Sequence, residues 1–294
     1  MANDLGDFAD ELGRCTFPPA GSAVSCAVSG GADSLALLVL AVAAQCSVTA
    51  IHVDHGLRPD SGSEADYVAA AADQVGAAFE SRTVSVTLGA NLEERARDAR
   101  REVLPADVLL GHTADDQAET VLLNMMWGSG VRGLAAMPHD GRRPLMRLRR
   151  TDTERVCVAA GLHPLRDSMN DDLRFRRVRV RQELLPLMNT IADRDMVPVL
   201  CRQAEVMADQ QRMLDQQAAH LDPGDCAGLQ AVDPVVAAET VRAWLRQQPG
   251  TTVDRATVQR VLAVAAGDAV GTDVGGGWQI RRTRQRLRLV PPER

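Results

Sequence analysis

The sequence predicts an α/β protein in which a doubly wound, mostly parallel sheet is followed by a smaller α+β domain. Two observations predict this fold class. Up to about residue 127, short β-branched apolar segments alternate with longer helical segments, the pattern of a parallel sheet with helices on both faces. Beyond about residue 190, the order changes to helices followed by short strands. A chain of 294 residues with 45% hydrophobic content is long enough for two domains with buried cores.

The first domain begins with a predicted strand over residues 23–28, a Ser-Gly-Gly turn and an apolar helix over 35–42. Further strands are predicted at 48–53, 79–86 and 107–111, alternating with helices at 63–75, 91–103 and 114–127. In such sheets, ligands bind beyond the carboxyl ends of the strands. We therefore expect three polar segments to meet in one crevice, namely residues 29–34, residues 54–58 and His112.

The second half of the chain is mostly helical. Helices predicted at 151–160 and 173–185, the latter ended by Pro186, precede a long helix at about 193–220. Two more helices at 234–246 and 253–266 and short strands within 272–289 follow. We place the domain boundary at residue 190, so that residues 1–190 form the main domain and residues 191–294 form a helical linker and the second domain.

An anion site is predicted between the first strand and its helix. It consists of Ser29, Gly30, Gly31, Ala32, Asp33 and Ser34. Glycines let the backbone approach a ligand closely, and the first amides and the dipole of a helix favour a phosphate. Asp33 would repel a bare phosphate but suits one that is bridged by a divalent cation. The alternative is an ordinary Gly-Gly turn.

The charged residues limit the chemistry and suggest a partner. All 33 basic residues are arginines, which excludes a Walker A lysine, a lysyl-adenylate and a lysine Schiff base. The net charge is −6, but residues 142–181 contain 12 Arg and 5 Asp or Glu, and residues 281–294 contain 6 Arg and 1 Glu. Two basic segments on an acidic body predict a polyanionic partner, and an arginine-rich solvated surface is the alternative.

Cysteine spacing and hydropathy predict the compartment. Six scattered cysteines without a Cys-x-x-Cys pair indicate free thiols in a reducing environment. No apolar window approaches the length of about 18 residues that a membrane span needs, and the acidic N-terminus does not resemble a signal peptide. We therefore expect a cytoplasmic protein without a membrane partner. The sequence leaves open whether the chain forms a homodimer.

Asp116 and Glu119 form a second candidate site. On a helix that begins near residue 114 they lie about 60° apart, on a face distinct from the apolar stripe. Paired carboxylates at the ligand edge of a sheet suit a metal ion or a substrate ammonium, whereas the alternative is helix N-terminal acids stabilised by the dipole. His52 and Asp54 are expected to face an adenine or a ribose. Trp127 is expected either to stack on a base or to pack in the core.

These segments resemble a known family. Residues 29–34 are similar to the S-G-G-x-D-S signature of PP-loop ATP pyrophosphatases, a motif shared by tRNA thiolases and amide-forming synthetases. Residues 52–58 (HVDHGLR), 111–120 (GHTADDQAET) and 128–130 (GSG) narrow the resemblance to tRNA(Ile)-lysidine synthetases. The likeness covers about residues 20–190 and implies the PP-loop, adenine-nucleotide α-hydrolase-like fold, with a tRNA-contacting domain after it.

The resemblance implies a two-step ligase reaction. ATP adenylates the C2 oxygen of the wobble cytidine in an isoleucine tRNA with a CAU anticodon, and pyrophosphate leaves. An amine of free L-lysine then displaces AMP, which leaves lysidine. By the same resemblance, Gly30, Gly31 and Ser34 hold the departing pyrophosphate, and Asp33 positions Mg²⁺.

Further roles follow from the resemblance. Asp116 and Glu119 bind the lysine substrate, His112 lines its pocket, Arg97 or Arg100 stabilises the α-phosphate, and the arginines of 142–181 contact tRNA phosphates. The positions that depart from the family pattern are Arg101, Trp127 and Met169. Two alternatives remain. One is another PP-loop tRNA enzyme such as a 2-thiolase, which the lack of a catalytic cysteine pair disfavours, and the other is a nucleotide-dependent RNA-binding protein without catalysis.

Overall fold

The structure is a computed structural model that describes residues 8–54, 61–84, 99, 102–165 and 172–292. The chain divides into two compact units, Met1–Glu205 and Val206–Arg294. Within the described residues, we find no helix with the length and apolar character that crossing a membrane requires.

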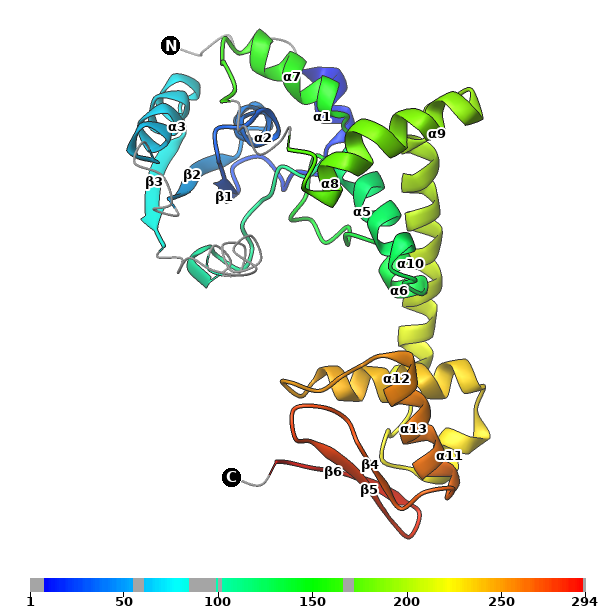
Figure 1. Cartoon of the computed structure of the whole chain (residues 1–294). Coiled ribbons are helices and arrows are strands. Elements are labelled where there is room, and N and C mark those ends of the chain that lie inside the picture. The colour runs from blue at the N-terminus through cyan, green and yellow to red at the C-terminus, as the bar shows by residue number, and fades with distance from the viewer. Residues whose placement is uncertain (1–7, 55–60, 85–98, 100–101, 166–171, 293–294) are drawn as a thin grey trace. The chain divides into compact units, whose positions relative to one another are not determined.

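A parallel sheet of three strands organises the first unit (Figure 1). Its order is β1 (Ala23–Ala27), β2 (Ser47–Asp54) and β3 (Ala78–Thr83). This sheet and the helices around it confirm the predicted α/β fold class. Parallel neighbours need crossover connections, and the helices between the strands provide them.

The fourth predicted strand is shorter than expected. The segment pairs with β1 only at Leu109, which forms a parallel bridge with Cys26. The Leu109 N–H donates to the Ser25 carbonyl at 2.8 Å, and the Ala27 N–H donates to the Leu109 carbonyl at 3.0 Å. The chain then leaves the sheet, because the next N–H, of Leu110, donates to a carbonyl outside it at 2.8 Å.

Helix α2 (Ala32–Ala43) lies at the centre of the main core. Its leucines 35, 37, 38 and 40 are fully buried. The helix contacts β1 and β2, and it also packs against α3 (Ser61–Val75) and α7 (Arg150–Ala159). A helix that is apolar on all sides has to be covered on all sides, and this packing fixes the N-terminus of α2 at the carboxyl edge of the sheet. The short helix α1 (Ala9–Arg14) precedes the sheet.

A second cluster of buried side chains in the first unit surrounds α5 (Ala114–Met126). Ala118, Val121 and Leu122 pack there with apolar residues of the segments around residues 180–204. The short α6 (Val131–Leu134) follows α5. Burying this stripe leaves Asp116 and Glu119 on another side of α5, where the arginine-bearing segment lies.

The predicted end of a helix at Pro186 is wrong. Helical backbone continues from α8 (Arg176–Arg179) through a π-helical turn, Val180–Leu184, into α9 (Leu185–Ala192). Pro186 lies in the first turn of α9, after the wider π-turn has interrupted the regular hydrogen-bond ladder. The absence of an N–H group on Pro186 therefore costs little, because the first N–H groups of a helix have no partner within the helix.

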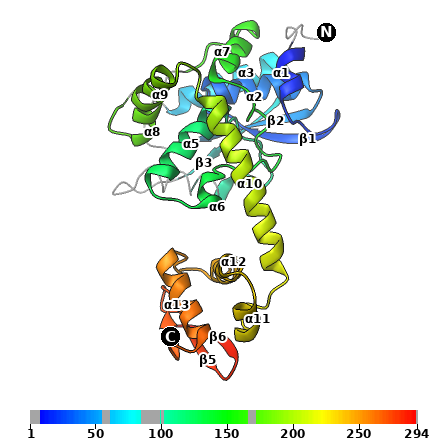
Figure 2. The ribbon, with the colours of Figure 1, turned by 90° about the vertical axis from the view of Figure 1, so that its right-hand side faces the viewer.

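The second unit begins at Val206, inside α10 (Val197–Ala219), and has its own core. Its helices and strands are α11 (Cys226–Ala231), α12 (Pro234–Arg246), α13 (Arg255–Ala266), β4 (Gly271–Asp273), β5 (Gln279–Thr283) and β6 (Arg286–Val290). The strands form an antiparallel sheet in the order β4-β5-β6 (Figure 1). Figure 2 shows β5 and β6 beside α13. Val241, Leu245, Val261 and Ile280 are fully buried between helices and sheet. This arrangement confirms the predicted α+β character of the second domain.

Candidate active site

The segment predicted to bind an anion is a tight turn after β1. Gly30 has φ +85°, a backbone conformation that L side chains rarely adopt. A Cβ atom at Gly30 would lie 2.8 Å from Cδ1 of Leu165, so the position also lacks room for a side chain. The Leu165 N–H donates to the Gly30 carbonyl at 2.9 Å. The turn therefore requires glycine both for its backbone and for the approach of Leu165.

Ser34 braces this turn from the start of α2. Its hydroxyl donates to the Gly31 carbonyl at 2.8 Å and accepts from the Ser29 N–H at 3.2 Å. Gly31 is the N-cap of α2 and has no side chain with which to cap the helix. The first amides and the positive dipole end of α2 are therefore available to an anionic ligand.

Gly111 brings a third segment to the same place. A Cβ atom there would lie 2.6 Å from the carbonyl oxygen of Asp33, so only glycine permits this approach. His112 follows directly and lines the cavity described below. The close contact of Gly111 thus positions His112 beside the N-terminus of α2.

Asp33 is held by two residues of α7. The Thr153 hydroxyl donates to Asp33 Oδ1 at 2.5 Å, and Arg150 Nε lies 3.5 Å from Oδ2. Burial raises the pKa of Asp33 to about 6, an effect that the Thr153 hydrogen bond only partly offsets. A carboxylate that is so reluctant to ionise in the free protein gains most from an added cation.

Asp116 lies on the first turn of α5 and is fully engaged. Its Oδ1 accepts from Arg150 at 3.0 Å and from Arg177 at 3.1 Å. Its Oδ2 accepts from the N–H of Thr113 at 2.9 Å and from the hydroxyl of Thr113 at 3.0 Å. Burial alone would raise the pKa of Asp116, but the charges of the two arginines hold it below its ordinary value.

Glu119 is fully buried one turn further along α5. Its Oε1 accepts from Arg150 at 3.1 Å and from Arg181 at 2.7 Å. Its Oε2 accepts from Arg177 at 2.7 Å and from Arg181 at 3.3 Å. Since a carboxylate offers about four lone-pair sites, these contacts saturate Asp116 and Glu119. We call these two carboxylates and three arginines the carboxylate–arginine cluster.

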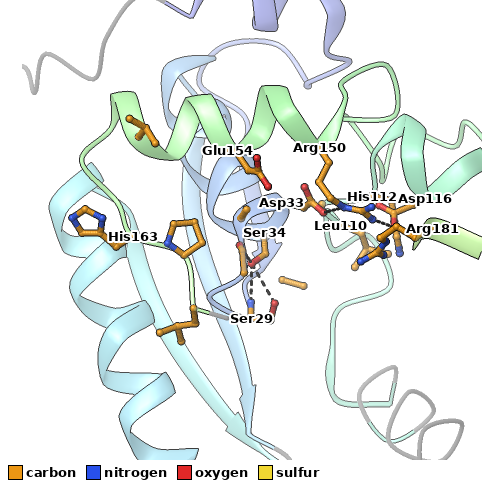
Figure 3. A pocket seen from close by; sticks show the side chains of 17 residues that line it. Ser29, Asp33, Ser34, Leu110, His112, Asp116, Arg150, Glu154, His163 and Arg181 are labelled. Atoms are coloured by element: carbon orange, nitrogen blue, oxygen red, sulfur yellow. Dashed lines mark hydrogen bonds and ion pairs between the residues drawn. The ribbon is translucent and has the colours of Figure 1, made fainter. Parts of the chain in front are cut away.

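A cavity of about 800 Å³ joins the turn and this cluster (Figure 3). It is lined by Ser29, Gly31, Asp33 and Ser34 of the turn, by His112, and by Asp116, Arg150 and Arg181 of the cluster, among others. Its volume falls within the range of small-molecule sites, about 300–1,000 Å³. The turn predicted to bind an anion and the Asp116 carboxylate therefore open into the same space.

Comparisons with known proteins identify the family of this chain. Residues 6–188 match the family described as the PP-loop domain, and residues 225–288 match the TilS substrate binding domain. The tRNA(Ile)-lysidine synthase of Nocardia farcinica is 38% identical, over 93% of this chain and 93% of that protein. The protein of the same name from Mycolicibacterium paratuberculosis is 42% identical, over 74% of this chain and 73% of that protein. This chain belongs to the tRNA(Ile)-lysidine synthase family.

The predicted family is thereby confirmed. Among solved structures, the fold is similar to the U34-tRNA thiolase NcsA from Methanococcus maripaludis, with a TM-score of 0.56 and 17% identity over 68% of this chain and 78% of that one. At this identity the likeness concerns the fold alone, and it agrees with the PP-loop class.

Not all residues predicted to bind the nucleotide meet at the cavity. Of the described ones, Gly30, His52 and Asp54 are not among its lining residues. His52 is buried within β2, with Nδ1 3.0 Å from the Val28 carbonyl oxygen, and Asp54 is half-buried at the end of β2. Arg97 and Arg100 lie outside the described residues.

Sequence reasoning missed the contribution of α7 and of the arginines that bind α5. Residues 142–181 had been expected to face tRNA phosphates, but Arg150, Arg177 and Arg181 bind carboxylates of their own protein. Spacing offered one signal. Arg177 and Arg181 are four residues apart on a helical segment, which complements the three-residue spacing of the two acids on α5.

Proposed function

We propose that this chain ligates free L-lysine to C2 of the wobble cytidine of an isoleucine tRNA with a CAU anticodon, with ATP as the second substrate. In the first step the C2 oxygen of the cytidine attacks the α-phosphorus and pyrophosphate leaves. In the second step a lysine amine attacks C2, and AMP leaves with the former C2 oxygen. The observation that carries this proposal is that the phosphate-binding turn and Asp116 line one cavity.

The turn and the start of α2 serve the first step. Backbone amides beside Gly30 and Gly31 and the dipole of α2 would hold the β- and γ-phosphates, so that charge on the departing pyrophosphate is stabilised in place. The sequence contains no lysine residue. Phosphate binding by fixed backbone amides agrees with this composition, because it needs no side-chain ammonium. We assign the α-phosphate to Arg97 or Arg100, as the family resemblance implies.

Asp33 is the residue suited to Mg²⁺. Within the described residues, no group of three or more His, Cys, Asp or Glu side chains could hold a metal ion by itself. Mg²⁺ in nucleotide sites is commonly bound by one or two carboxylates together with substrate phosphates, and Asp33 at the mouth of the turn meets that requirement. When bound, the ion would neutralise phosphate charge during the departure of pyrophosphate.

Asp116 and Glu119 serve the second step by binding lysine. Because the three arginines already saturate both carboxylates, an incoming ammonium has to replace a guanidinium. Arg181 is the arginine best placed to yield, since it lines the cavity and, among the described residues, pairs with Glu119 alone, whereas Arg150 and Arg177 each also bind Asp116. A displaced guanidinium would stay near the cavity, where the phosphates of ATP or tRNA provide a new partner. His112, on the same wall, would orient the cytidine or the amine.

The second unit is assigned to tRNA binding. In the register of its sheet, Arg281 of β5 lies directly opposite Arg288 of β6, and both side chains are exposed. Like charges directly opposite each other across a sheet are destabilising unless an anion lies between them. We therefore assign this pair to a tRNA phosphate. We assign the reaction to the cytoplasm, because both proposed substrates, tRNA and free lysine, occur there.

Mass spectrometry of the modified nucleoside tests the proposal. The purified full chain is incubated with ATP, Mg²⁺, lysine and an isoleucine tRNA transcript with a CAU anticodon, and the digested RNA is analysed. Lysidine at the wobble position is expected only when both ATP and lysine are present. An unmodified cytidine under saturating substrates contradicts the proposal. Tight tRNA binding without turnover would instead favour an RNA-binding protein without catalysis.

A further inference from the structure

Trp127 lies on the surface of the first unit. It is the C-cap residue of α5 and is 64% exposed, with the neighbouring Met125 and Met126 also more than half exposed. The guanidinium carbon of Arg176 lies 6.0 Å from the centre of the Trp127 ring. Of the two expectations for Trp127, packing in the core is therefore wrong. A large aromatic face is presented to solvent with a cation over it.

The position of this pair relates it to the active site. Trp127 is eleven residues after Asp116 on α5, which at 1.5 Å per residue is about 16 Å along the helix axis. Arg176 begins α8 and immediately precedes Arg177, which binds both Asp116 and Glu119. The two elements that build the carboxylate–arginine cluster thus also carry the exposed ring and its cation. When the reactive nucleotide of an RNA chain occupies the cavity, another nucleotide a few positions away in the same RNA can reach Trp127.

The charge around the ring favours nucleic acid over an apolar partner. Exposed arginines 174, 176 and 179 lie on the segment beside it. Arg174 pairs with Asp172 and Arg179 pairs with Glu183, but residues 172–183 contain five arginines and only two acids, and this excess of positive charge favours a polyanion. Unpaired bases in RNA loops are commonly recognised by stacking on aromatic rings and on arginine planes. At 6.0 Å the guanidinium is at the outer limit of an attractive cation–π contact, so little is lost when a base takes its place on the ring.

We propose that Trp127 and Arg176 form a stacking platform for one unpaired base of the tRNA anticodon loop, outside the catalytic cavity. This inference rests on the proposed function, since it takes the same tRNA as the ligand. The base stacks on the Trp127 ring while Arg176 contacts the base or its phosphate. The platform would hold the loop so that the wobble cytidine enters the cavity.

Equilibrium binding of full-length tRNA tests the platform without ATP or lysine, so its outcome is independent of lysidine formation. Trp127→Ala is expected to weaken binding roughly 5- to 100-fold, the range for loss of one base–aromatic stack. Trp127→Phe is expected to retain most of the affinity. Ile191→Ala, which truncates an apolar side chain that is 76% exposed on α9, is the matched control and should bind like the wild type.

A series of tRNAs with one abasic nucleotide in the loop identifies the stacked base. One abasic position should weaken wild-type binding by the same factor as Trp127→Ala and should have no further effect in that variant. Equal binding by wild type and Trp127→Ala would overturn the proposal and leave this surface to a protein partner. A loss in Trp127→Ala that no abasic position reproduces would also overturn it. Because Trp127 is exposed, the melting temperature should not change, and lysidine formation by the wild type reports separately on the proposed function.

Discussion

The guanidinium of Arg181 donates to both carboxylate oxygens of Glu119, at 2.7 Å and 3.3 Å. Glu119 is fully buried and therefore has lost its hydration. Its pairing with Arg181, and those with Arg150 and Arg177, stabilise the carboxylate charge in place of water. The family resemblance assigns Glu119 to a substrate cation, yet the free protein fills that place with its own arginines. In the proposed function, lysine binding is therefore an exchange in which the substrate ammonium replaces an arginine guanidinium at the carboxylates.

Removing the charge of Glu119 should destabilise the first unit. Glu119→Gln leaves three guanidiniums without their shared carboxylate, and we expect it to lower the free energy of unfolding by about 2 to 4 kcal/mol, near the value for breaking a buried pair. The arginines are 22–31% exposed and regain some hydration, which favours the lower end. Thermal unfolding measures the change.

A double-mutant cycle measures the interaction between Glu119 and Arg181. Glu119→Gln combined with Arg181→Gln should be less destabilised than the sum of the single variants, because each removes the unpaired charge that the other leaves. Asp209→Asn, in an exposed pair with Arg212, should change stability by less than about 0.5 kcal/mol. Strict additivity of the two single variants would contradict the account of Arg181.

Asp152 should make stability depend on pH. Its Oδ2 accepts from Arg14 of α1 and from the Arg149 N–H, both at 2.8 Å. Burial would raise the pKa of Asp152, but these bonds hold it below its ordinary value. A carboxylate of this kind stabilises the fold above its unfolded pKa, about 4, and the contribution is lost as pH falls through its lower folded pKa.

We therefore expect Asp152→Asn to melt roughly 2 to 6 °C below the wild type at pH 7, for a loss of about 1 to 2 kcal/mol. The difference between the two melting temperatures should start to shrink as the pH falls below about 4, and it should vanish once the pH lies below the lower folded pKa, where the wild-type carboxyl is protonated as well. Melting curves from acidic to mildly alkaline pH measure the difference. A gap that stays constant over that range would show that the charge of Asp152 does not contribute.

The pair Arg281 and Arg288 should appear in the salt dependence of tRNA binding. Each phosphate contact adds about 0.7 to 0.9 to the slope of log affinity against log salt. Replacing both arginines with alanine should reduce the slope by roughly 1 to 2 while the second unit stays folded, since a like-charge pair is removed. Arg212→Ala, on α10, is the matched control. An unchanged slope in the double variant would remove this pair from the tRNA interface.

Much of the fold followed from local patterns. The alternation of apolar runs and the Ser-Gly-Gly turn predicted β1, α2 and their shared edge, because strand and helix periodicities are local properties. The end predicted at Pro186 was wrong because a π-turn had already released the hydrogen bond that proline lacks. Of the strand predicted at 107–111, only one bridge at Leu109 forms. Strand pairing depends on the path of the following chain, which the composition of the segment does not determine.

The site was less accessible from the sequence. Asp33 and Asp116 line the cavity, as their motifs suggest, but the arginines that hold Asp116 come from positions 34 and 61 residues away along the chain. Such pairings are decided by tertiary packing, and an arginine-rich segment has the same composition whether it faces solvent or a buried acid. The exposure of Trp127 was undecided for the same reason.

In the proposed function, Asp33 serves pyrophosphate release and Asp116 serves lysine binding within one cavity. Asp33→Asn and Asp116→Asn preserve the size of each side chain and an acceptor oxygen, so the amide introduced at position 116 can still accept a hydrogen bond from Thr113. Both variants should bind tRNA like the wild type.

A single-turnover assay that follows pyrophosphate and lysidine in one reaction tests this most directly. Asp33→Asn should lose both products together, by roughly 100-fold or more. Asp116→Asn should release pyrophosphate at close to the wild-type rate, accumulate adenylated tRNA, and form lysidine only at much higher lysine concentrations. If Asp116→Asn instead loses pyrophosphate release as severely as Asp33→Asn, with tRNA binding intact, the division of the cavity between the two steps is contradicted.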